Sequence, residues 1–229
     1  MKYSESQVVD ETRKFFCEVY AWMFLGLVIS GVTAYVVSGD PDLYKPIIFN
    51  GYMFKGLLIG ELLLVFGLVW MAERISAGTA ILLFLLYCFS IGLTLSVIFL
   101  VYTIESIGQM FFVSALMFGV MSIYGFYTKT DLTHIGQVLI MGLFGLIIAG
   151  ITNMILNNAT LDWILSIVGV VTFTGLTAYD TQKIRQLNKI GNAGTEEDTK
   201  EAILGALNLY LDYVNLFLKL LRLFGKRKS

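Results

Sequence analysis

Long uncharged stretches alternate with short polar segments along the chain. Residues 75–104 and 106–128 contain no charged side chain, and residues 132–161 contain only the usually neutral His134. Each stretch exceeds the about 20 residues that a helix needs to cross the hydrocarbon core of a bilayer. Backbone groups at that depth must bond within their own segment, so each stretch is predicted to be helical. The whole pattern predicts an all-α integral membrane protein with seven transmembrane helices, at residues 17–38, 47–71, 78–102, 107–127, 136–156, 161–183 and 202–224.

The charges outside these helices predict three parts and an orientation. We expect a polar N-terminal tail at 1–16, a single seven-helix membrane domain at 17–224 and a basic tail at 225–229. Cytoplasmic loops are rich in Lys and Arg. The N-terminal tail and the loops after the second, fourth and sixth helices hold nine of these residues, whereas the third and fifth loops hold none. The N-terminus is therefore predicted to be cytoplasmic.

The basic tail does not follow this charge rule. Seven full crossings would place Lys226, Arg227 and Lys228 on the side opposite to the N-terminus. Either the last helix tolerates that arrangement, or it is a re-entrant segment that returns to the cytoplasm. Counting Lys and Arg does not decide between these two possibilities.

Composition supports the membrane assignment and excludes several classes of function. Hydrophobic residues make up 57% of the chain and charged residues 14%, with a mean hydropathy of +0.76, whereas soluble domains have about 25% charged residues. The net charge of −1 argues against nucleic-acid binding, and a single histidine excludes His-based zinc sites. Cys17 and Cys88 form neither a Cys-x-x-Cys motif nor a disulfide framework. We expect no cofactor.

Two acidic residues lie inside predicted helices, where ionisable groups are costly and usually functional. Glu61 is in the middle of the second helix, and no basic residue of that helix is close enough to neutralise it. It is either a protonated glutamate that bonds to another helix or a contact for protons or cations. Asp180 is near the end of the sixth helix, one turn from Lys183. An ordinary i,i+3 surface pair is the alternative to a functional role for Asp180.

A third intramembrane acid, Asp212, belongs to a polar stripe on the last helix. At 100° per residue, the members of this stripe fall within an arc of about 80°. Such a stripe must face protein or water, because lipid does not solvate it. An amphipathic helix on the membrane surface is the alternative interpretation. The wide apolar face instead favours a central helix along a polar path, with the stripe formed by Asn208, Asp212, Asn215, Lys219 and Arg222.

The residue types on these helices favour particular ions. Carboxylates and amides, without histidine or thiolate ligands, suit protons and hard cations. If Asp180 and Asp212 meet, two carboxyl groups in a low dielectric should share one proton. Loss of that proton would change the helix packing, so the pair would form a pH-sensitive gate.

Three segments carry recognisable motifs: FGVMSIYGFYTKTDL at 118–132, GLTAYDTQKI at 175–184 and LGALNLYLDYVNLFL at 204–218. They resemble the Bax inhibitor family, also called the transmembrane BAX-inhibitor-motif proteins, and most closely its bacterial branch. The resemblance implies six helices around a central C-terminal helix and a pH-sensitive calcium leak. It implies that Asp180 and Asp212 form the pH sensor and contact calcium only transiently, and that Glu61 is associated with the pore. It also implies a bacterial inner-membrane location, with the bilayer, calcium and protons as partners.

The chain departs from the family pattern at one position. A calcium-leak member has an arginine near the end of the second helix that binds the sixth-helix aspartate, whereas this chain has Ala72 there. Arg74, two residues later, is the candidate replacement. The acidic stretch at 194–201 is predicted to be an exposed loop.

Other functions fit the same residues. A cation/proton exchanger would use the same carboxyl groups, and a non-transporting regulator of a membrane protein would use none of them for flux. An intramembrane aspartyl protease needs two aspartates as acid and base. Tyr179-Asp180 matches half of the presenilin-type signature, but Asp212 lacks the preceding Gly-x-Gly of the other half. The expected function is therefore a calcium leak and not an enzyme.

Overall fold

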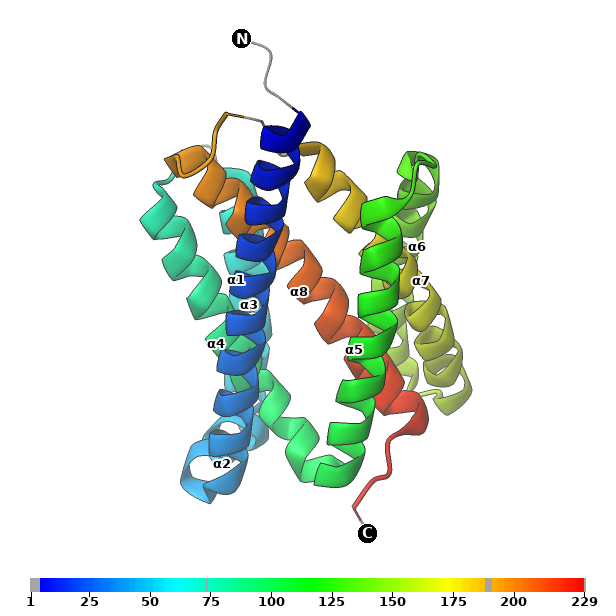
Figure 1. The fold of residues 1–229 in the computed structure, drawn as a ribbon. Helices are drawn as coiled ribbons and strands as arrows, with labels where there is room; N and C mark the ends of the chain where they lie inside the picture. The colour runs from blue at the N-terminus through cyan, green and yellow to red at the C-terminus, as the bar shows by residue number, and fades with distance from the viewer. Residues whose placement is uncertain (1–4, 73, 188–190, 229) are drawn as a thin grey trace. The chain divides into compact units, whose positions relative to one another are not determined.

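The computed structural model describes residues 5–72, 74–187 and 191–228, and these residues form eight α-helices (Figure 1). Within the described residues, extended pairing is limited to an isolated antiparallel bridge between Tyr102 and Arg227. The helices are α1 Glu5–Gly39, α2 Pro41–Phe49, α3 Gly51–Met71, α4 Ala77–Val101, α5 Ile104–Tyr127, α6 Thr133–Leu156, α7 Ala159–Leu187 and α8 Glu196–Phe224.

Seven of these helices are long and apolar enough to cross a membrane. They match the seven predicted segments one for one, so the all-α seven-helix membrane fold is confirmed. The additional helix, α2, contains both prolines of the chain, Pro41 and Pro46. Pro41 is tolerated because the first N–H groups of a helix have no partner within it. The side chain of Asp40 caps this helix by accepting a hydrogen bond from the N–H of Asp42 at 2.9 Å.

Two helices extend beyond the segments predicted for them, because hydropathy detects only the membrane-embedded part of a helix. The first helix begins at Glu5, so residues 5–16 of the predicted polar tail belong to α1. The predicted acidic loop at 194–201 is helical from Glu196 onward. Thr195 caps this helix by accepting a hydrogen bond from the N–H of Asp198 at 3.2 Å. Acidic residues in a first helical turn are stabilised by the helix dipole.

The helices cluster into two compact units, one of Met1–Val101 with Leu187–Tyr210 and one of Tyr102–Gln186 with Leu211–Ser229. In the first unit, α1 and α3 both pack against α4 (Figure 1). Gly92 of α4 permits a close approach to α1, since a Cβ on it would lie 2.6 Å from the Thr33 side chain. Tyr210 of α8 completes this core. Its hydroxyl is hydrogen-bonded to Ser30 at 2.6 Å, and its ring meets Phe84 edge to face.

In the second unit, α5 and α6 pack against α7 through glycines. A Cβ on Gly125 of α5 would collide with the backbone of Ala178. A Cβ on Gly136 of α6 would collide with the ring of Tyr179. The absence of side chains at these positions therefore sets how closely α5 and α6 approach the part of α7 that bears Asp180.

The last helix, α8, contributes one half to each unit. Buried residues make up 67% of its most apolar stretch, compared with 6–33% in the other six membrane-length helices. The alternative of an amphipathic helix on the membrane surface is therefore wrong. The arrangement of the other six membrane helices around α8 stays a prediction.

Both ends of α8 are hydrogen-bonded to the ends of other membrane helices. In its first turn, Glu196 accepts a hydrogen bond at 2.9 Å from the N–H of Ala77, at the start of α4. Beyond its last turn, the N–H of Thr103 donates to the carbonyl of Lys226 at 3.0 Å, and the N–H of Lys226 donates to Ser106 Oγ at 2.8 Å. Thr103 follows α4 directly. Each end of α8 is therefore hydrogen-bonded within its own unit, and the choice between a full crossing and a re-entrant segment stays a prediction.

Candidate functional site

The carboxyl groups of Asp180 and Asp212 are close neighbours in the second unit. Asp180 comes from α7 and Asp212 from α8, and the side chain of Asp212 is buried. An ionised carboxylate only accepts hydrogen bonds, so a bond between two carboxyl groups requires at least one proton on the pair. The second oxygen of Asp212, Oδ2, has no hydrogen-bond partner among the described residues. The arrangement can hold one shared proton inside the protein.

An i,i+3 surface pair with Lys183 does not account for all the neighbours of Asp180. Lys183 is exposed and is an electrostatic neighbour of Asp180, and its Nζ lies 5.9 Å from the centre of the Tyr179 ring. Asp180 nevertheless has a second, buried neighbour in Asp212. The structure therefore supports a paired carboxyl group and not only an i,i+3 surface contact.

Polar residues of α7 next to Asp180 attach it to α5 and to the α5–α6 connection. The hydroxyl groups of Thr181 and Ser122 are 3.0 Å apart. The side-chain amide of Gln182 bonds to two backbone groups of the connection, and Arg185 donates to the backbone carbonyls of Phe126 and Thr128. Sequence analysis missed Gln182 and Arg185. Two polar side chains at the end of an apolar segment are a signal that the sequence does contain. The backbone groups to which they bond cannot be read from the sequence.

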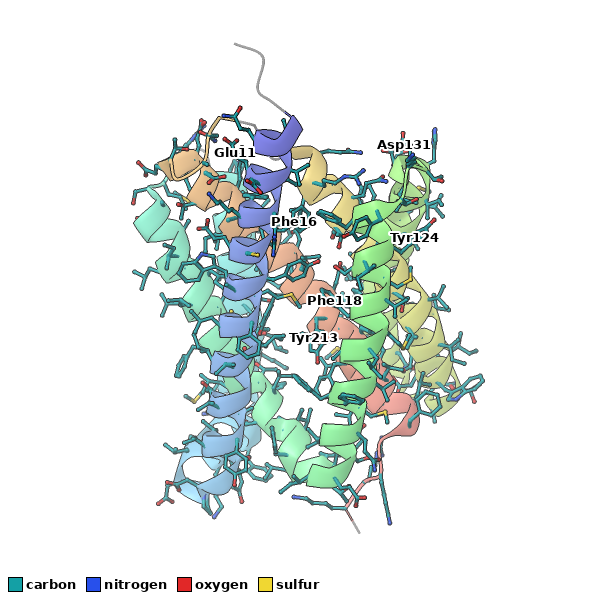
Figure 2. All side chains as sticks on the ribbon, viewed as in Figure 1. Glu11, Phe16, Phe118, Tyr124, Asp131 and Tyr213 are labelled. Atoms are coloured by element: carbon teal, nitrogen blue, oxygen red, sulfur yellow. The ribbon has the colours of Figure 1, made fainter. Side chains whose placement is uncertain are left out.

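An aromatic cluster holds α8 against α5 beside Asp212. Tyr213 follows Asp212, and its hydroxyl donates to the carbonyl of Phe111 at 3.0 Å. Its ring is edge to face with that of Phe111, with centroids 5.3 Å apart, and with that of Phe118, with centroids 5.6 Å apart. Phe118 and Tyr213 are labelled in Figure 2. Such pairs contribute about 0.5–1.5 kcal/mol each beyond burial, so this cluster fixes the orientation of α8 at the carboxyl pair.

The other members of the polar stripe lie in different surroundings. Asn208 is half-buried in the first unit. In the second unit, Asn215 donates to the carbonyl of Leu211, one turn back in its own helix, at 2.8 Å. Arg222 forms an ion pair with Asp162 of α7 at 2.8 Å, and the stem of Lys219 packs on α7. Asp162 was not among the predicted site residues, because it lies at the start of its helix.

Glu61 lies in the first unit and is buried on α3. Its Oε1 accepts a hydrogen bond from the hydroxyl of Thr94 of α4 at 2.5 Å. This matches the expectation of a glutamate bonded to another helix, and its association with a pore stays a prediction. Arg74 is exposed in the turn after α3, in the same unit. Its replacement of the family arginine stays a prediction as well.

No group of three or more His, Cys, Asp or Glu side chains within the described part of the chain is placed to hold a metal ion. Asp180 and Asp212 supply two carboxyl groups, whereas calcium in proteins takes six to eight oxygen ligands. The pair therefore fits transient contact with a passing cation better than stable binding. The transient contact itself stays a prediction.

Sequence comparisons relate the chain to bacterial membrane proteins. Residues 12–229 match the family described as inhibitor of apoptosis-promoting Bax1. The inner membrane protein YbhL of Escherichia coli K12 is 43% identical over 93% of this chain and 92% of its own length. An uncharacterized protein of Borreliella burgdorferi is 43% identical over 98% of this chain and 97% of its own length. The protein RP147 of Rickettsia prowazekii is 38% identical over 99% and 95% of the two chains.

Proposed function

The chain belongs to the Bax inhibitor family of integral membrane proteins, and we propose that it is a pH-gated calcium leak of the bacterial inner membrane. The observation that supports the proposal is that Asp180 and Asp212, on membrane helices α7 and α8, are close neighbours. Burying two carboxyl groups in a membrane protein costs free energy, so such a pair usually has a function. The charge of the pair depends on pH.

The shared proton holds α7 and α8 together at the pair. When it leaves, two carboxylates face each other at close range. Two unit charges about 4 Å apart repel by about 4 kcal/mol at an effective dielectric of about 20. This repulsion favours separation of the two helices, and the two negative charges attract a divalent cation. Deprotonation therefore opens the path and draws calcium into it, so the flux rises with pH.

A cation/proton exchanger is the second candidate, because the same pair can give up its proton to the cation that replaces it. Obligatory coupling distinguishes the two. An exchanger moves protons outward for every calcium ion that enters, whereas a leak passes calcium down its gradient without stoichiometric proton flux.

The test is calcium influx into liposomes that contain the pure protein and a calcium dye, measured between about pH 6 and pH 8 around neutrality. We expect influx to rise with pH in the wild type and to lose this dependence in Asp180→Asn and Asp212→Asn, which leave one carboxyl group unpaired. Asp42→Asn, at an exposed position on α2, is the matched control and should behave as wild type. Absence of protein-dependent influx at every pH would refute the leak. A proton dye in parallel vesicles tests for exchange.

A further inference from the structure

Beyond the carboxyl pair, the contact between α7 and α8 holds a second group of charges: Asp162 on α7 and Lys219 and Arg222 on α8, all in the second unit. Lys219 and Arg222 are members of the polar stripe. Lys219 is seven residues from Asp212, which is about 10.5 Å along the helix axis. A cation that follows the polar stripe from the carboxyl pair toward the C-terminal end of α8 therefore passes Lys219 first and Arg222 next.

Lys219 is held at this position by a glycine. A Cβ on Gly169 of α7 would lie 2.9 Å from three carbons of the Lys219 side chain, so the lysine stem lies directly on the backbone of α7. Lys219 is half-buried. The packed stem fixes the ammonium group along the α7–α8 contact instead of leaving it free to extend into solvent.

The charges in this group do not balance. Arg222 is paired with Asp162 at 2.8 Å. Within the described residues, no carboxylate forms an ion pair with Lys219, whose electrostatic neighbours are the positive Arg222 and the negative Asp162. One unit of positive charge is therefore left over at the end of the polar stripe that lies away from the carboxyl pair.

We propose that Lys219 is the residue that limits cation passage, as a fixed positive charge on the path between the carboxyl pair and the C-terminal end of α8. This inference rests on the proposed calcium flux, and it assigns separate roles to the two groups of charges. The carboxyl pair makes the flux depend on pH. Lys219 sets its size by repelling divalent cations at every pH, and Asp162 partly offsets that repulsion.

The test compares calcium influx in liposomes for Lys219→Met, Lys219→Gln and Lys219→Arg. The first two remove the charge and should raise influx about tenfold at each pH, without moving the pH at which influx is half-maximal, since tenfold corresponds to a modest change in barrier. Lys219→Arg keeps the charge and should stay near wild type. Lys55→Met, at an exposed position on α3, is the matched control for loss of a lysine from a membrane-length helix.

Asp162→Asn separates charge from packing. It removes the negative neighbour of Lys219 and breaks the ion pair with Arg222. If charge limits passage, this variant should lower influx about threefold or more. If any loosening of the α7–α8 contact raises influx, Asp162→Asn should raise it together with Lys219→Met, and that result would overturn the proposal.

The outcomes for the two proposals are distinguishable. Influx in Lys219→Met and Lys219→Gln that stays within twofold of wild type overturns the role of Lys219, whatever the wild-type flux is. A wild type that conducts nothing, beside a Lys219→Met variant that conducts, refutes the wild-type leak but supports the barrier. A pH-dependent wild-type flux with unchanged Lys219 variants leaves the leak in place and removes the barrier alone.

Discussion

Gln182 of α7 holds the connection between α5 and α6 with both halves of its side-chain amide. Its Oε1 accepts from the N–H of Leu132 at 2.8 Å, and its Nε2 donates to the carbonyl of Thr130 at 2.8 Å. Leu132 immediately precedes α6 and is buried, as is Gln182. The substitution Gln182→Leu keeps a side chain of similar size and removes both hydrogen bonds.

The expected cost follows from the burial of each bond. The bond to Leu132 is buried, so its loss leaves an unsatisfied N–H at about 1–3 kcal/mol. The bond to Thr130 is partly buried, and its loss costs about 0.5–1.5 kcal/mol. Together they give about 1.5–4.5 kcal/mol. A loss of about 2 kcal/mol within this range raises the opening equilibrium of this connection by about 30-fold.

Amide hydrogen exchange at residues 130–134, followed by mass spectrometry of the protein in micelles, measures this opening. The control is Gln186→Leu, one turn further along α7, where the glutamine is exposed. We expect exchange about 30-fold faster in Gln182→Leu and unchanged in Gln186→Leu. Gln182→Glu keeps the acceptor but not the donor, so it should fall between the two. Exchange in Gln182→Leu no faster than in Gln186→Leu would show that the amide does not hold the connection.

Two further predictions concern α6 and its N-terminal side. Gly136→Ala places a Cβ against the Tyr179 ring and should destabilise the protein by about 1–3 kcal/mol in thermal unfolding, whereas Gly145→Ala, on the same helix with open space, should be neutral or slightly stabilising; equal melting temperatures would contradict the packing argument. The hydroxyl and N–H of Thr133 donate to Asp131 and lower the pKa of its carboxyl group below the ordinary 3.8. Any stabilisation from Asp131 is therefore present above pH 3.8 and is lost as the pH falls through the lowered pKa. Thr133→Val should raise that pKa toward its ordinary value in a carboxyl-carbon NMR titration, and an unchanged titration would show that the hydroxyl has no effect.

The seven membrane helices and the meeting of Asp180 with Asp212 were predictable from the sequence. Uncharged runs longer than a bilayer crossing have few alternatives to a helix, because backbone groups in lipid must bond within the segment. An acid on each of two such helices has few places to lie other than beside a polar partner. The sequence also contains the signal for the start of α8, although that stretch was predicted to be a loop. Thr195 followed by acidic residues and then an apolar run is typical of a helix N-terminus.

The partners of individual polar side chains were not predictable. Gln182 bonds to backbone groups about 50 residues earlier in the chain. Which backbone groups those are depends on how α5 and α6 align with α7, and glycine packing sets that alignment. The contact of Gly169 with Lys219 depends in the same way on the alignment of α7 with α8. A single sequence specifies the faces of helices but not the position of one helix along another.

The division of α8 between the two units, between Tyr210 and Leu211, has a consequence for biosynthesis. Translation proceeds from the N-terminus, so α8 is made after the other six membrane-length helices of the described residues. Until it emerges, Ser30 has no Tyr210 to bond in the first unit, and Phe111 has no Tyr213 to bond in the second. Each unit is left with an unfilled interior. A ribosome that stops before α8 therefore produces neither unit in finished form. Assembly of both units requires that α8 has been synthesised.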